Sequence, residues 1–92
     1  MGSYRIFETE TFQKYTARLA TAALGRLTQK LQQQIYPRLR MEPHFGRNIK
    51  RLRNWQPPTW RYRIGSWRFF YEIDEQKQIV FMIAADHRSE AY

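Results

Sequence analysis

The chain of 92 residues contains no cysteine, two histidines and few glycines or prolines. Without cysteine, disulfide bonds, thiolate catalysis and thiolate-bound zinc are excluded, and a reducing cytosol is a suitable environment. The longest apolar run, Ile79 to Ala85, is too short to span a bilayer, and the N-terminus lacks the apolar segment of a signal peptide. We therefore expect a cytoplasmic protein with no membrane segment, no metal site and no small-molecule cofactor.

The length predicts a single domain over residues 1–92, near the lower limit for a chain that buries a self-sufficient core. Hydrophobic residues make up 42% of the sequence and aromatic residues 16%. Because each large aromatic side chain buries a large area, this composition supports a packed core and argues against disorder.

Acidic residues are scarce, with 8 Asp and Glu against 16 Lys and Arg, which gives a net charge of +8. Such a charge favours binding to a polyanion or to an acidic protein. The excess is concentrated in residues 38–68, where Glu42 is the only acid and the rest of the chain is balanced. The bases of this segment are Arg38, Arg40, Arg47, Lys50, Arg51, Arg53, Arg61, Arg63 and Arg68.

The hydrophobic spacing predicts a strand, two helices and a loop in the first two thirds of the chain. Residues 4–8 alternate as a short strand does, and Thr9 or Thr11 is a suitable N-cap for the helix that follows. The second helix is expected to end at Pro37, and residues 38–58 are expected to form a basic loop. The apolar stripes are Phe12, Tyr15 and Leu19 in the first helix and Leu24, Leu27, Leu31 and Ile35 in the second.

The last third predicts three antiparallel strands. Residues 60–64 and 67–73 alternate on either side of Gly65-Ser66, a two-residue turn of the type with glycine first. Residues 74–77 form a second turn, and residues 78–85 are apolar on both faces, as a central strand is. The expected fold class is α+β: an N-terminal strand, a helical hairpin and an antiparallel three-strand meander forming one sheet.

The Gly65-Ser66 turn also sets the register of the hairpin. Residues two apart share a face, so one face is apolar and is expected to pack on the helices, while the other is cationic. Arg63 lies opposite Arg68, and Arg61 lies opposite Phe70. The apolar face holds Trp60, Tyr62, Ile64, Trp67, Phe69, Tyr71 and Ile73, and the other face holds Arg61, Arg63, Arg68, Phe70 and Glu72.

We call Arg61, Arg63 and Arg68 the arginine triangle. Like charges directly opposed on adjacent strands destabilise a sheet by roughly 0.2–1 kcal/mol, so the triangle is better explained by an anion than by folding. Guanidinium groups suit phosphate oxygens, and Phe70 is expected to stack on an RNA base. A basic face is often only solvated, and the loop cations Arg47, Lys50, Arg51 and Arg53 either contact RNA or only add long-range attraction.

Titratable groups gather after the apolar strand, between Asp86 and Tyr92. Histidine transfers protons near neutral pH, and nearby guanidinium groups favour the phenolate of a tyrosine. A histidine or a tyrosine alone is more commonly structural. The expected proximity of His87 and Tyr92 to the arginine triangle favours a role in proton transfer, and Arg88 is expected to bind RNA beside them.

The sequence resembles the RelE/ParE toxins of type II toxin–antitoxin systems, and the resemblance spans most of the chain. It implies the RelE-like microbial RNase fold, a cognate antitoxin partner and, in the RelE branch, cleavage of messenger RNA on the ribosome without metal. The resemblance rests on Asn48 to Arg53, Trp60-Arg-Tyr-Arg-Ile-Gly65, Trp67-Arg-Phe-Phe-Tyr-Glu-Ile-Asp74, Ile79-Val-Phe-Met-Ile83 and His87-Arg88-Ser-Glu-Ala-Tyr92.

In that chemistry a ribose 2′-OH attacks the adjacent phosphorus and leaves a 2′,3′-cyclic phosphate and a free 5′-OH. The resemblance implies that the arginine triangle stabilises the developing charge and that Tyr92, with His87 in some branches, transfers protons. Two alternatives remain open: a ParE-like inhibitor of DNA gyrase without RNase activity, and a non-catalytic homologue that acts only by binding an antitoxin.

Overall fold

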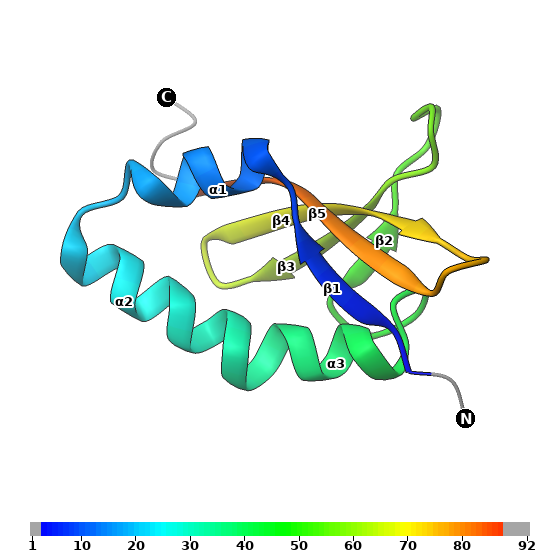
Figure 1. Ribbon diagram of the computed structural model, residues 1–92, viewed down its shortest axis with the longest axis horizontal. Coiled ribbons are helices and arrows are strands. Elements are labelled where there is room, and N and C mark those ends of the chain that lie inside the picture. Colours follow the sequence, from blue (N-terminus) through cyan, green and yellow to red (C-terminus); the bar gives the residue numbers. More distant parts are fainter. Residues whose placement is uncertain (1–2, 88–92) are drawn as a thin grey trace.

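The computed structural model describes residues 3–87, which form one five-stranded sheet with helices on one of its faces (Figure 1). The strand order is β1-β5-β4-β3-β2, with β1 (Arg5–Glu8) parallel to β5 (Ile79–His87) and every other pair antiparallel. The α+β class and the central position of the last strand are therefore confirmed. None of the helices in residues 3–87 is long and apolar enough to cross a membrane.

The first helix, α1 (Glu10–Ala17), begins where the sequence predicts. The Thr9 side chain accepts a hydrogen bond from the Phe12 backbone N–H at 3.3 Å, which caps the helix. The Thr9 hydroxyl also donates to the Met82 carbonyl at 2.7 Å and thereby fixes the start of α1 on β5. Phe12 is fully buried, and Tyr15 and Leu19 pack at the edge of the core.

The second helix does not end at Pro37, contrary to the sequence-based expectation. It runs through α2 (Thr21–Lys30), a π-helical turn η1 (Leu31–Ile35) and α3 (Tyr36–Met41). In the π turn the Tyr36 backbone N–H bonds to the Leu31 carbonyl, five residues back. This wider turn places Pro37 at the first turn of α3, where its missing N–H and its ring are tolerated.

The segment 38–58 is not only a loop. Its first residues complete α3, and β2 (Ile49–Arg51) adds an edge strand to the sheet, so the sheet has one strand more than the sequence predicts. A three-residue strand whose last two residues are exposed has too short an alternation to be recognised.

The hairpin of β3 (Trp60–Ile64) and β4 (Trp67–Asp74) has the predicted register. Ile64 pairs with Trp67, Arg63 with Arg68, and Arg61 with Phe70. Gly65 has φ +58°, as the first residue of the predicted turn requires. The face of the sheet that packs on the helices, here called the inner face, carries the predicted apolar set; the opposite face is the outer face.

A β-bulge changes the phase of β5. Phe70 pairs with Ala84 while Tyr71 pairs with Met82, so Ile83 is an extra residue in β5. Before the bulge the even-numbered residues face the core, as buried Val80 and Met82 show. After the bulge the odd-numbered ones do, beginning with Ala85.

Candidate nucleic-acid interface

The outer face carries a row of cations across three strands. In the β2–β3 register Lys50 lies opposite Arg61, and in the β3–β4 register Arg63 lies opposite Arg68. Directly opposed residues share a face, so these four side chains lie on the same side of the sheet. The structure thus extends the arginine triangle by one lysine from the edge strand.

A shallow depression runs along the β2–β3 edge and collects several of the predicted RNA-binding residues. Arg47, Lys50, Arg61 and Arg63 all line it, together with Asn48, Ile49, Ile64 and Gly65. No carboxylate lines the depression, so its field is positive throughout. A surface of this charge attracts polyanions, including the backbone of a nucleic acid.

Arg61 has a buried Nε–H group with no hydrogen-bond partner among the described residues. Leaving such a donor unsatisfied costs about 1–3 kcal/mol. The Arg61 side chain is flanked in register by Lys50 on one side and Phe70 on the other. The Nε–H is itself shielded from solvent, so the fold leaves this cost in place.

Asp86 forms a bidentate ion pair with Arg68 that the sequence did not predict. The Nε and Nη2 atoms of Arg68 donate to the two carboxylate oxygens of Asp86, each at 2.8 Å. Both side chains remain more than a third exposed. Asp86 therefore orients the guanidinium and lowers the net charge at this corner of the arginine triangle.

His87 lies on the inner face, contrary to the expected position beside the arginine triangle. It pairs with Trp67, and the two rings meet edge to face with centroids 4.7 Å apart. The bulge at Ile83 is the reason, because simple alternation from Val80 and Met82 would have put residue 87 on the outer face. Tyr92 and Arg88, the other expected groups of this segment, lie outside the described residues.

Of the remaining predicted cations in the described residues, Arg51 lies on the inner face and Arg53 lies in a loop. Arg51 pairs with Trp60, and its guanidinium carbon lies 5.6 Å from the centre of the Trp60 ring, so it belongs to the inner face. This cation–π contact gives Arg51 a partner within the fold. Arg53 is exposed in the loop between β2 and β3.

Phe70 lies on the outer face as predicted, but another aromatic ring covers it. Trp55, from the loop between β2 and β3, stacks on Phe70 with ring centroids 6.1 Å apart and an angle of 10° between the planes. The only sequence signal was a large aromatic residue within a proline-rich loop. Trp55, at 48% exposure, is thus the ring presented to solvent over Phe70.

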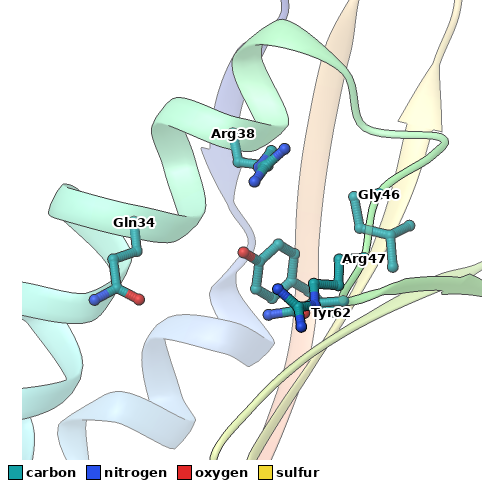
Figure 2. A pocket seen from close by; sticks show the side chains of 7 residues that line it. Gln34, Arg38, Gly46, Arg47 and Tyr62 are labelled. Atoms are coloured by element: carbon teal, nitrogen blue, oxygen red, sulfur yellow. The ribbon is translucent and has the colours of Figure 1, made fainter.

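A second cationic cleft opens at the edge of the helical layer. Figure 2 shows Gln34 and Arg38 projecting from η1 and α3, with Arg47 approaching from the loop before β2, around the ring of Tyr62. Gly46, Asn48 and Ile49 complete the lining. Arg47, Asn48 and Ile49 line both this cleft and the outer depression.

Within residues 3–87, no group of three or more histidine, cysteine or carboxylate side chains has an arrangement suited to a metal ion.

Known proteins share both sequence pattern and fold with this chain. The model of a family described as the ParE toxin of type II toxin–antitoxin system, parDE, matches residues 8–92. A chain of the toxin–antitoxin complex RelBE2 from Mycobacterium tuberculosis is 27% identical, with a TM-score of 0.75 and coverage of 97% of this chain and 95% of that one. No curated protein sequence matches.

Two more distant structures share the fold. A chain of the intact RelBE complex of E. coli is 23% identical, with a TM-score of 0.66 and coverage of 92% and 96%. A chain of the archaeal RelE–RelB complex from Pyrococcus horikoshii OT3 is 17% identical, with a TM-score of 0.61 and coverage of 94% and 96%.

Proposed function

The chain belongs to the ParE toxin family of type II toxin–antitoxin systems, within the RelE/ParE superfamily, and from this premise we propose that it is a metal-independent endoribonuclease that cuts messenger RNA on the ribosome. The observation that carries the proposal is the cationic outer face, on which Lys50, Arg61, Arg63 and Arg68 lie together. A phosphodiester supplies anionic acceptors for such a surface.

The proposed reaction is attack of a ribose 2′-OH on the adjacent phosphorus, which yields a 2′,3′-cyclic phosphate and releases the 5′-OH of the next nucleotide. The arginine triangle stabilises the negative charge that develops on the phosphoryl oxygens. The attacking hydroxyl loses a proton and the leaving oxygen gains one. Because His87 faces Trp67 on the inner side, we assign proton transfer to Tyr92, the residue that the family resemblance also implies.

The proposed protein partner is a cognate antitoxin. Two of the similar structures are described as complexes of RelE with RelB, and the third as the toxin–antitoxin complex RelBE2. An antitoxin with acidic segments would complement the net charge of +8, the outer depression and the cleft at the helical layer. Loss of RNA cleavage on complex formation is the expected consequence.

Inhibition of DNA gyrase is the second candidate, and the observation that favours it is the ParE family model matched over residues 8–92. A basic face also suits an acidic protein, so charge alone does not separate the two functions.

The discriminating experiment combines two measurements on the native chain. Primer extension on messenger RNA after brief induction, with and without translation, is expected to show new 5′ ends only in translated transcripts. A supercoiling assay with purified gyrase is expected to show no inhibition. Intact transcripts together with inhibited supercoiling would refute the RNase proposal and support inhibition of DNA gyrase.

A further inference from the structure

The exposed ring of Trp55 is the largest aromatic surface beside the cations of the outer face. One side of the indole lies parallel on Phe70, and the residue is nonetheless 48% exposed. Because about half of the Trp55 surface stays exposed, burial on folding accounts for only part of the reason to have a tryptophan here. The stacked pair leaves a flat π-surface available to a further planar group.

The loop that carries Trp55 is fixed at its base. It projects beyond the sheet between β2 and β3 (Figure 1), and the Leu52 backbone N–H donates to the Thr59 carbonyl at 2.9 Å. The Thr59 hydroxyl, in a residue that is 1% exposed, donates to the Pro57 carbonyl at 3.0 Å. A ring held in this way loses little conformational entropy when a ligand stacks on it.

The position of the ring relative to the cations matches the parts of a nucleotide. Phe70, under Trp55, is the cross-strand partner of Arg61, and Arg61 is the cross-strand partner of Lys50. Neighbouring strands lie about 4.8 Å apart, so the aromatic stack has one cation on the next strand, Arg61, and a second, Lys50, on the strand beyond it.

We propose that Trp55 stacks on an unpaired nucleobase of the bound RNA, next to a phosphate held by Arg61 and Lys50, and that it thereby sets a base preference. The proposal rests on the RNA-directed function proposed above and adds to it a residue outside the arginine triangle. Stacking accepts every base but gains more from a larger π-surface. Trp55 therefore favours purines over pyrimidines at this position, and its contribution does not depend on salt.

The test compares the binding of short single-stranded adenine and uracil ribo-oligonucleotides, made uncleavable by 2′-O-methylation, to the native chain and to three variants. Trp55→Ala is expected to weaken adenine binding at least about fivefold and to remove the preference for adenine over uracil. Trp55→Phe keeps an aromatic ring and is expected to retain the preference. Phe45→Ala, which removes another exposed ring away from the outer-face row, is the matched control and is expected to bind as the native chain does.

Salt titration separates stacking from charge. Trp55→Ala is expected to keep the native slope of affinity against salt, whereas Arg61→Ala lowers the slope and weakens both oligonucleotides equally. Native affinity and preference in Trp55→Ala would overturn the proposal, as would a loss confined to binding of an antitoxin protein. Circular dichroism checks that each variant is folded.

Failure of the RNase proposal is a separate outcome. The RNase proposal is tested by measuring transcript cleavage by the native chain. The stacking proposal is tested by measuring the base preference of the variants.

Discussion

Arg68 is subject to two opposing electrostatic influences. Arg63 lies directly opposite it across β3 and β4, which costs roughly 0.2–1 kcal/mol. The contact with Asp86 offsets this cost, but because both side chains are more than a third exposed it contributes no more than about 1 kcal/mol. The stability of the fold therefore depends little on Arg68.

We expect Arg68→Ala to reduce transcript cleavage by about 10²-fold or more while changing the free energy of unfolding by no more than about 1 kcal/mol. Cleavage is measured by primer extension and stability by urea unfolding. Arg5→Ala, which removes an exposed arginine from β1 at the far edge of the sheet, is the control and should cleave normally. Equal loss in both variants would show that only total charge matters.

Tyr92→Phe tests the proton transfer that we assign to the phenol. General acid–base catalysis contributes typically 10²- to 10⁴-fold, so loss of the hydroxyl is expected to lower cleavage at least about tenfold while ribosome binding is unchanged. His87→Ala is the comparison. If Tyr92→Phe cuts transcripts at the native rate and His87→Ala does not, the proton transfer belongs to His87.

The site could be predicted from the sequence as far as strand alternation holds. The two-residue turn at Gly65 set the register, so the arginine triangle and Phe70 were placed on the correct face. The bulge at Ile83 has no signature in a run of apolar residues, and it moved His87 from the expected outer face to the inner face. Trp55 was missed because its contact with Phe70 comes from a loop, whose path no periodicity describes.

At the scale of elements, hydrophobic spacing predicted the helices but not their continuity. The π turn that carries the chain through Pro37 forms by backbone hydrogen bonds five residues apart, which no side-chain pattern specifies. The continued helix brings Arg38 to the cleft with Arg47 and Tyr62. One local irregularity thus creates a cationic cleft that the sequence alone did not reveal.

Gly65 and Gly25 both have open space around them but differ in backbone conformation, since Gly65 has a positive φ and Gly25 is helical. Gly65 has φ +58° and a Cβ there would meet nothing within 4 Å, so Gly65→Ala carries only a backbone cost, roughly 1–2 kcal/mol of stability. Gly25, inside α2, also has open space, and Gly25→Ala is expected to stabilise by roughly 0.5–1 kcal/mol. Urea unfolding of both variants measures the difference, and shifts of the same sign would contradict this account.

His44 joins three segments at the end of β5 remote from His87. Its Nδ1 lies 2.9 Å from an oxygen of Glu42, and its Nε2 lies 2.5 Å from an oxygen of Glu75, which also accepts a hydrogen bond from Tyr4. Partial burial by itself lowers the pKa of His44, but the hydrogen bonds to Glu75 and Glu42 outweigh it, and the pKa is raised. The protonated imidazole is thus a bridge between two carboxylates.

This bridge predicts a pH-dependent stability. Because folding raises the pKa of His44, its contribution is complete below the unfolded-state value of about 6.5 and is lost as the pH rises through the folded-state value. Between about pH 6 and about pH 9 the native chain is expected to lose up to about 1 kcal/mol relative to His44→Gln, since Glu42 and Glu75 are half-exposed. Urea unfolding at both pH values measures it, and parallel pH profiles would refute the bridge.

At the scale of the whole molecule, the core and the row of Lys50, Arg61, Arg63 and Arg68 lie on opposite faces of one sheet. The buried cluster fills the inner face beneath the helices, while the described helices leave the outer face uncovered (Figure 1). A chain of this size can therefore keep a compact core and still present a cationic surface. The same surface that suits RNA is the one that an acidic partner would neutralise.

Expression in a sensitive bacterium tests this dual use of one surface. The native chain, produced alone, is expected to stop growth, and co-expression with the product of an adjacent short reading frame is expected to restore it, since the antitoxin competes with RNA for the same cations. The purified complex should bind RNA more weakly and with a smaller salt slope than the free chain, because fewer cations remain to contact phosphates. A double variant, Arg61→Ala with Arg63→Ala, is the control and should allow growth without the partner. Normal growth at high soluble expression of the native chain would contradict the toxin function, and restored growth with unchanged RNA binding by the complex would show that the partner acts away from the outer face.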